Sequence, residues 1–201
     1  MRPLKLGITG GIGSGKSVVC RIFKEIGIPV YDADQEAKIL LKSDPEIVSA
    51  VKQLIGKEAY DPSGSPNRAF ISSVVFSSPE KLEALNNIIH PAVRKNFLEW
   101  VDANAEKKIV VKEAAIMFES GAWKDMDFIA VVVAPEACRI ARVLKRDSKN
   151  EKQIKAIIDQ QLPEAELIKR ADFVVVNNDH QLVMPQILSL IEELENRISA
   201  K

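Results

Sequence analysis

The chain has 201 residues, 46% of them apolar, and its 28 lysines and arginines balance 28 aspartates and glutamates. This length indicates one domain, or one domain with an insertion, on a prior of roughly 150 residues per domain. The apolar content can supply a core, which disfavours disordered and fibrous architectures. The balanced charge leaves no overall field to attract nucleic acid or an acidic membrane surface. We therefore expect any phosphate to be held locally.

The sequence has no segment typical of a membrane-spanning or secreted protein. Its longest wholly apolar run, Phe128 to Ala134, is far shorter than the roughly 20 residues that a spanning helix needs. The first residues lack the charged and then apolar pattern of a secretory signal. We expect a cytoplasmic protein without membrane or nucleic-acid partners. Cys20 and Cys138 lie in apolar periodic stretches and are expected to pack in the core.

Short apolar runs in chain order predict the strands of a parallel sheet. They lie at residues 4–9, 28–31, 109–111, 128–133 and 173–176. Segments with helical spacing separate them, and the strands are nearly continuous apolar runs. This pattern is typical of an α/β fold in which helices cover both faces of the sheet.

The stretch between the second and third strands is too long for a simple crossover. Its residue pattern predicts helices and turns, with a loop over residues 60–66. We expect a single domain with a core of residues 1–34 and 105–201 and a helical insertion of about residues 35–104. The polar stretch from Arg146 to Gln161 predicts a mobile lid, over about residues 142–162.

A glycine-rich loop follows the first predicted strand. Residues Gly10 to Ser17 match G-x-x-x-x-G-K-[ST] and lead into a helical segment over residues 16–26. Glycines let the backbone N–H groups turn inward, and the helix N-terminus adds positive charge for an anion. The motif predicts ATP or GTP binding, with Lys16 on the β- and γ-phosphates and the Ser17 hydroxyl on a Mg²⁺ that arrives with the nucleotide. The expected nucleotide contacts in this segment are Gly11, Gly13, Ser14, Gly15, Lys16, Ser17 and Val18.

Two carboxylates follow the second predicted strand, at Asp32 and Asp34. In phosphoryl transfer, a carboxylate can take the proton of the acceptor hydroxyl or orient that hydroxyl, and a second one can order water around Mg²⁺. We expect Asp34 to be the catalytic base and Asp32 to support it. The alternative is that Asp34 only caps the following helix.

Several later segments, together with these residues, resemble the dephospho-coenzyme A kinase family. They are Asn67-Arg68 before Val75-Phe76, the run Leu85 to Pro91 (L-N-x-I-x-H-P), Phe118-Glu119, Arg142 to Asp147, and Ala171 to Asn177. They occur in the order and spacing of that family. The chain departs from the family pattern at Val18, where threonine is usual, and over Glu113 to Met117, which lacks the usual aspartate and proline.

The resemblance implies a three-layer P-loop kinase fold with a five-stranded parallel sheet, a helical acceptor-binding insertion and a lid. It implies transfer of the γ-phosphoryl group of ATP to the ribose 3′-hydroxyl of dephospho-coenzyme A, the last step of coenzyme A synthesis. On this interpretation the insertion holds the acceptor and the lid closes over ATP. A monomer and a small homo-oligomer are both compatible with the sequence.

Two arginines of the predicted lid are candidates for the nucleotide phosphates. Arg142 and Arg146 stand four apart and would share a helix face, where a bound anion relieves their repulsion. Arg142 is the first choice as a catalytic arginine, because an arginine stabilises charge on the transferring phosphoryl oxygens. The alternative is a solvated basic face with Asp147 as partner.

The remaining candidates also have a functional and a structural interpretation. Arg68, His90, Phe118 and Glu119 are expected to contact the acceptor, together with Asp32 and Asp34. Arg68 could instead be a surface residue, His90 a buried neutral histidine at a helix end, and Glu119 a helix cap. Asn177 could border the adenine or simply form a turn.

Two other functions are compatible with the loop. The first is another P-loop nucleotide or metabolite kinase with a similar lid. The second is a GTP-binding switch protein, which would need a guanine-reading N-K-x-D segment, and the run Asn177 to His180 does not supply one.

Overall fold

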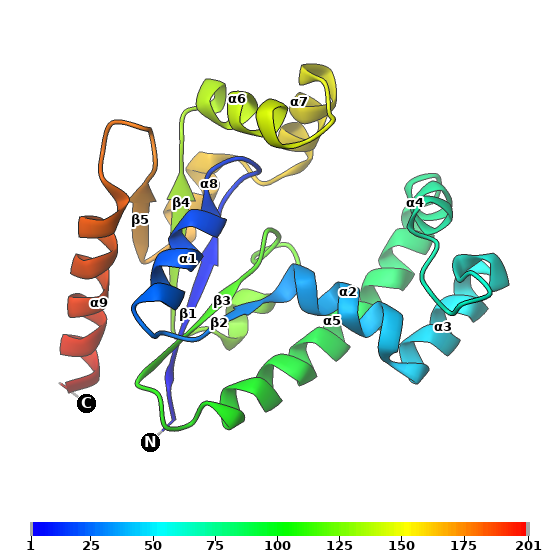
Figure 1. Cartoon of the computed structure of the whole chain (residues 1–201), viewed down its shortest axis with the longest axis horizontal. Helices are drawn as coiled ribbons and strands as arrows, with labels where there is room; N and C mark the ends of the chain where they lie inside the picture. The colour runs from blue at the N-terminus through cyan, green and yellow to red at the C-terminus, as the bar shows by residue number, and fades with distance from the viewer. Residues whose placement is uncertain (1, 200–201) are drawn as a thin grey trace. The chain divides into compact units, whose positions relative to one another are not determined.

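The computed structural model describes residues 2–199, which divide into two compact units. The sheet unit comprises residues 2–31 and 101–199, and the helical unit comprises residues 32–100. Each unit can be followed by colour along the chain in Figure 1. No helix among the described residues is long and apolar enough to cross a membrane.

The sheet has the strand order β2-β3-β1-β4-β5. Its strands are β1 (Leu4–Thr9), β2 (Val30–Asp32), β3 (Ile109–Glu113), β4 (Phe128–Val133) and β5 (Phe173–Val176). β1 pairs in parallel with both β3 and β4, and β4 pairs in parallel with β5. The predicted five-stranded parallel sheet is therefore confirmed.

Helices of the sheet unit cover both faces of the sheet. The helices of this unit are α1 (Lys16–Glu25), α6 (Glu136–Arg146), α7 (Glu151–Gln160), α8 (Glu164–Arg170) and α9 (Val183–Ser199), with a short 3-10 helix, η2, at Ala122–Asp125. One face packs on α1 and α9 through buried residues such as Phe23 and Leu194. The opposite face packs on α8 through Val131 and Leu167. Both faces are apolar because both are covered, which explains the continuous apolar runs in the sequence.

Two strand boundaries differ from the sequence prediction. β3 continues past Val111 through Lys112 and Glu113, which pair with Gly7 and Ile8 of β1. The apolar pattern missed these residues because both are charged. β2 begins at Val30 instead of residue 28 and ends at Asp32, the first residue of the helical unit.

The helical unit has a hydrophobic core of its own. Its elements are α2 (Ala33–Ser43), α3 (Pro45–Ile55), the 3-10 helix η1 (Lys57–Ala59), α4 (Arg68–Phe76) and α5 (Pro79–Ala103), whose last residues from Val101 onward belong to the sheet unit. Ile47, Val51 and Ile71 pack together in this core. Asp44 caps α3 by accepting from the backbone N–H groups of Glu46 and Ile47.

Candidate active site

The glycine loop joins β1 to α1 and turns sharply. Gly10, Gly13 and Gly15 have φ angles of 148°, 76° and 98°, which side chains disfavour. A Cβ atom at Gly15 would also collide with the amide of Asn177. The Lys16 ammonium bends back and donates to the carbonyl oxygen of Gly10 at 2.8 Å. The loop therefore needs its glycines, and it lies at the N-terminus of α1, where partial positive charge favours an anion.

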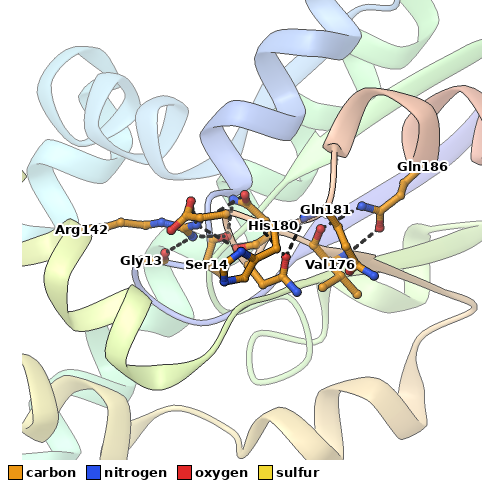
Figure 2. Close-up of polar contacts among 10 residues, drawn as sticks. Gly13, Ser14, Arg142, Val176, His180, Gln181 and Gln186 are labelled. Carbon is orange, nitrogen blue, oxygen red and sulfur yellow. Dashed lines mark hydrogen bonds and ion pairs between the residues drawn. The ribbon is translucent and has the colours of Figure 1, made fainter.

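Arg142 of α6 contacts this loop directly, as Figure 2 shows. Its Nη1 atom donates to the carbonyl oxygens of Gly13 and Ser14 at 3.3 and 3.4 Å. Its Nη2 atom donates to the carbonyl oxygen of Asn177 at 2.8 Å and to the carboxylate of Asp179 at 2.6 Å. The structure thus brings Arg142 and Asn177, two residues named from the sequence, to the glycine loop.

The segment after β5 is held in place from α9. Gln186 accepts from the N–H of Val176 at 2.8 Å and donates to its carbonyl oxygen at 2.9 Å, and both bonds are visible in Figure 2. The next residue, Asn177, donates from its side-chain amide to the carbonyl oxygen of Ser14 at 2.9 Å. The end of β5 therefore closes one side of the glycine loop.

Arg146 does not accompany Arg142 to the loop. Its Nε and Nη2 atoms donate to the carboxylate of Asp147 at 2.8 and 3.1 Å, and its side chain is 62% exposed. This hydrogen bonding raises the pKa of the Arg146 guanidinium and lowers the pKa of the Asp147 carboxyl. The structure therefore shows Arg146 with Asp147, the alternative partner named from the sequence, and the contact of Arg146 with the nucleotide phosphates stays a prediction.

Sequence reasoning missed two side chains that hold the backbone of Ile12, in the middle of the glycine loop. The Nε atom of Arg139 donates to the carbonyl oxygen of Ile12 at 2.9 Å. The Oε1 atom of Gln161 accepts from the N–H of Ile12 at 2.8 Å. Arg139 is only 7% exposed, and the only sequence signal for it was its position on the same face of α6 as Arg142, three residues later.

The two aspartates after β2 have different local roles. Asp32 caps α2, and its carboxylate accepts from the N–H of Gln35 at 2.9 Å. Asp34 lies in the first turn of α2 and is exposed. The capping role that the sequence left open for Asp34 therefore belongs to Asp32. A carboxylate in a first helical turn is favoured by the helix dipole.

Arg68 and His90 both lie in the helical unit. Arg68 is the exposed first residue of α4, directly after the capping residue Asn67. His90 is half-buried in the middle of α5, so the expectation that it ends a helix is wrong. Pro91 removes one backbone hydrogen bond, but α5 continues to Ala103 because later residues such as Phe97 are buried.

Phe118 and Glu119 lie in the segment between β3 and η2. Phe118 is 8% exposed and packs with Ile129 and Leu167, while the guanidinium of Arg170 lies 5.7 Å from its ring centroid. The structure therefore places Phe118 in the core of the sheet unit. Glu119 is exposed, and its carboxylate accepts from the N–H of Leu162 at 3.4 Å.

Glu113, the last residue of β3, interacts with a buried thiol of α1. Burial raises the pKa of Cys20 far above its usual value, and the charge and hydrogen bond of Glu113 raise it further, whereas Lys16 and Lys24 act in the opposite direction. Cys20 is 3% exposed and belongs to the core cluster under the sheet. The thiol is therefore neutral at physiological pH and packs as a small apolar group.

Next to the loop, the first turn of α1 offers an oxygen ligand for a cation. Within residues 2–199, no group of three or more His, Cys, Asp and Glu side chains is arranged to hold a metal ion. Ser17 presents an exposed hydroxyl in the first turn of α1, and oxygen is the donor that Mg²⁺ prefers. The Ser17 hydroxyl is therefore an oxygen ligand of the kind that suits Mg²⁺.

Comparisons with known proteins agree on one family. Residues 4–183 match the family model described as dephospho-CoA kinase. A dephospho-CoA kinase of Chlorobaculum tepidum is 41% identical over 198 residues, which cover 96% of this chain and 93% of that protein.

Solved structures extend this similarity to the fold. The crystal structure of TT1252 from Thermus thermophilus has a TM-score of 0.85 at 31% identity, covering 96% of this chain and 98% of that one. Dephospho-CoA kinase from Campylobacter jejuni has a TM-score of 0.71 at 25% identity, covering 94% and 96%. The similarity therefore spans nearly the whole length of both chains.

Proposed function

Because the chain belongs to the dephospho-CoA kinase family, we propose that it transfers the γ-phosphoryl group of ATP to the ribose 3′-hydroxyl of dephospho-coenzyme A. The products are coenzyme A and ADP. The observation within the molecule that supports this proposal best is the glycine loop, with Lys16 and Arg142 both contacting its backbone. We place the reaction in the cytoplasm, and the enzyme acts as a monomer or a small homo-oligomer.

The nucleotide side of the reaction is assigned to the sheet unit. Inward N–H groups of the glycine loop and the ammonium of Lys16 bind the β- and γ-phosphates. Arg142 neutralises charge that develops on the transferring group, which a guanidinium does well in a site with little water. Asn177 borders the adenine from the end of β5.

Ser17 would hold Mg²⁺ through its hydroxyl, alongside the nucleotide phosphates. When bound, the ion supplies positive charge that neutralises the β- and γ-phosphate oxygens. Lys16, the residue before Ser17, adds a fixed positive charge at the start of α1. The chain itself therefore contributes orientation and charge, with few direct metal ligands.

The acceptor side is assigned to the helical unit and the segment before η2. Asp34 orients the 3′-hydroxyl and takes its proton as the oxygen bonds to the γ-phosphorus. The bond between that phosphorus and the β,γ-bridging oxygen breaks, and ADP leaves with the electron pair. Asp32 supports Asp34, while Arg68, His90 and Glu119 contact the acceptor. Phe118 contributes from the core by fixing the segment that carries Glu119.

Residues 142–162 are proposed to act as a lid over ATP. They include the end of α6, all of α7 and the following residues. A lid that excludes water strengthens every charge interaction inside the site and prevents hydrolysis of ATP.

A direct assay tests the proposed activity. Purified protein with ATP, Mg²⁺ and dephospho-coenzyme A should form one ADP and one coenzyme A per turnover, with a new phosphate monoester signal in ³¹P NMR. A folded protein that yields no such product contradicts the proposal. A panel of other hydroxyl acceptors at equal ATP then identifies a different metabolite kinase. Nucleotide hydrolysis only with GTP would indicate a switch protein.

A further inference from the structure

Ile12 contacts the α6–α7 region through its carbonyl oxygen, its N–H group and its side chain. Its carbonyl oxygen accepts from Arg139 and its N–H donates to Gln161. Its side chain packs against the apolar cluster of Ile140, Val143 and Ile154, which joins α6 to α7. The sequence separations from Ile12 to Arg139 and to Gln161 are 127 and 149 residues, so these contacts belong to the tertiary structure and are not local turn bonds.

We propose that Arg139 and Gln161 are positioning residues for the phosphates of ATP, acting through the backbone of Ile12. This inference rests on the proposed nucleotide role of the glycine loop. Neither side chain needs to touch the nucleotide. Together they set the conformation of the loop whose N–H groups face it.

The physical reason is the flexibility of the loop sequence. Gly10, Gly11, Gly13 and Gly15 surround Ile12 and Ser14, and glycine loses more conformational freedom on ordering than any other residue. A loop that is ordered before the ligand arrives spends less binding free energy on ordering. Holding both polar groups of Ile12 removes freedom where the loop has no regular secondary structure.

The side chains of Arg139 and Gln161 differ in how deeply they are buried, and therefore in how much their replacement would disturb the fold. Arg139 is buried, and its Nη1 atom lies 3.9 Å from the carboxylate of Glu164 in α8. Loss of Arg139 would leave the partly buried carbonyl of Ile12 without its donor, which destabilises the fold. Gln161 is half-buried at the C-terminal cap of α7. It is therefore the better residue to change.

Gln161 also links the loop to the proposed lid. It follows α7 directly, so a displacement of α7 changes the position of the oxygen that holds the N–H of Ile12. The geometry of the phosphate loop and the position of α7 are thereby coupled through this hydrogen bond, in addition to the apolar packing of Ile12.

The test compares Gln161→Met with Gln160→Met. Methionine has the length of glutamine but supplies only a weak acceptor, and Gln160 is an exposed neighbour at the end of α7. Calorimetry measures the affinities of each folded variant for ATP and for AMP, whose single phosphate engages fewer loop amides. We expect Gln161→Met to weaken ATP binding by about 10-fold and AMP binding by less than about 2-fold. Gln160→Met should leave both affinities unchanged.

A second readout follows the bond itself. Hydrogen exchange of the Ile12 amide, measured by NMR without nucleotide, should become about 10-fold faster in Gln161→Met and stay unchanged in Gln160→Met. Equal weakening of ATP and AMP binding would show a general structural role and overturn the proposal. Unchanged ATP affinity would overturn it as well. Neither measurement needs the acceptor. The positioning role of Arg139 and Gln161 can therefore fail while kinase activity is present, and it can hold while kinase activity is absent.

Discussion

In the sheet unit, charged side chains reach backbone groups that lie far away in the sequence, whereas in the helical unit Asp32, Asp44 and Asn67 cap the helices next to them. Arg142 joins the glycine loop to the end of β5, across 129 and 35 residues. Asp34 and Arg68 instead lie exposed in the first turns of α2 and α4. The difference indicates that the proposed nucleotide side is preorganised by tertiary contacts and that the proposed acceptor side is presented by individual helices.

The largest effect is expected at the proposed base. Asp34→Asn keeps the shape of the side chain but removes the negative charge that would accept the proton. We expect kcat to fall by about 10²- to 10⁴-fold, with the affinity for ATP nearly retained, because the phosphates are assigned to the sheet unit. Steady-state kinetics and calorimetry measure the two quantities.

Glu36→Gln is the matched control for this change. Glu36 is also an acid in the first turn of α2, so the neutralised charge near the helix start is comparable. Its kcat should stay within about 2-fold of the wild-type value. Equal kcat in Asp34→Asn and wild type would remove Asp34 from the role of base.

The next largest effect separates Arg142 from Arg146, both of which belong to α6. Arg142→Ala should lower kcat/KM for ATP by about 100-fold, because it removes a guanidinium that holds the glycine loop and the end of β5 together and that neutralises charge on the transferring group. Arg146→Ala should change it by less than about 3-fold, because an exposed ion pair contributes little. Similar losses in both variants would show that Arg146 leaves Asp147 when nucleotide binds.

A core substitution tests the independence of the helical unit. Val51 is fully buried in the core of that unit, so Val51→Ala should lower the free energy of unfolding by about 2 kcal/mol. Val48, in the same helix, is only partly buried, and Val48→Ala should have a smaller effect. Denaturant unfolding measures the loss. The ATP affinity of the folded variants should equal that of wild type. A large change in this affinity would contradict the assignment of ATP binding to the sheet unit.

The smallest effect concerns the buried thiol of α1. Because the pKa of Cys20 is raised in the folded state from about 9.0, the unfolded chain loses this proton first as pH rises. Ionisation of this thiol therefore leaves the free energy of unfolding unchanged below about pH 9. Above that pH it lowers the free energy of unfolding by about 1.4 kcal/mol per pH unit. Cys20→Ala should remove this part of the pH dependence, which denaturant titrations at pH 8 and 10 can measure. A thiol reagent should label the half-buried Cys138 in the native protein and Cys20 only after unfolding.

The glycine loop and the strands around it could be predicted from sequence because their signals are local. Eight consecutive residues, Gly10 to Ser17, define the loop, and β1, β4 and β5 are apolar runs that match the predicted strands. The end of β3 could not be predicted, since charged Lys112 and Glu113 occupy paired positions in the sheet. A strand predicted from a run of apolar residues ends where charged residues begin.

The contacts of buried polar residues were the hardest to predict. Nothing in a single sequence distinguishes Arg139, which is buried against the loop, from Arg146, which is exposed and donates to Asp147. Their difference arises from what lies opposite each one in the tertiary structure. The same holds for Pro91, whose local preference to end a helix is outweighed by the burial of later residues of α5.

The strand order has a consequence for the synthesis of the chain. β1 is made first, yet both of its neighbours in the sheet, β3 and β4, begin at residues 109 and 128. All six residues of β1 are buried in the finished fold, so the nascent chain carries this strand without a neighbouring strand until β3 has been made. The helical unit, whose core uses contacts within residues 32–100, is complete by then. We expect the chain to fold from its middle outward, and the strand that leads into the glycine loop to be a binding site for chaperones until β3 emerges.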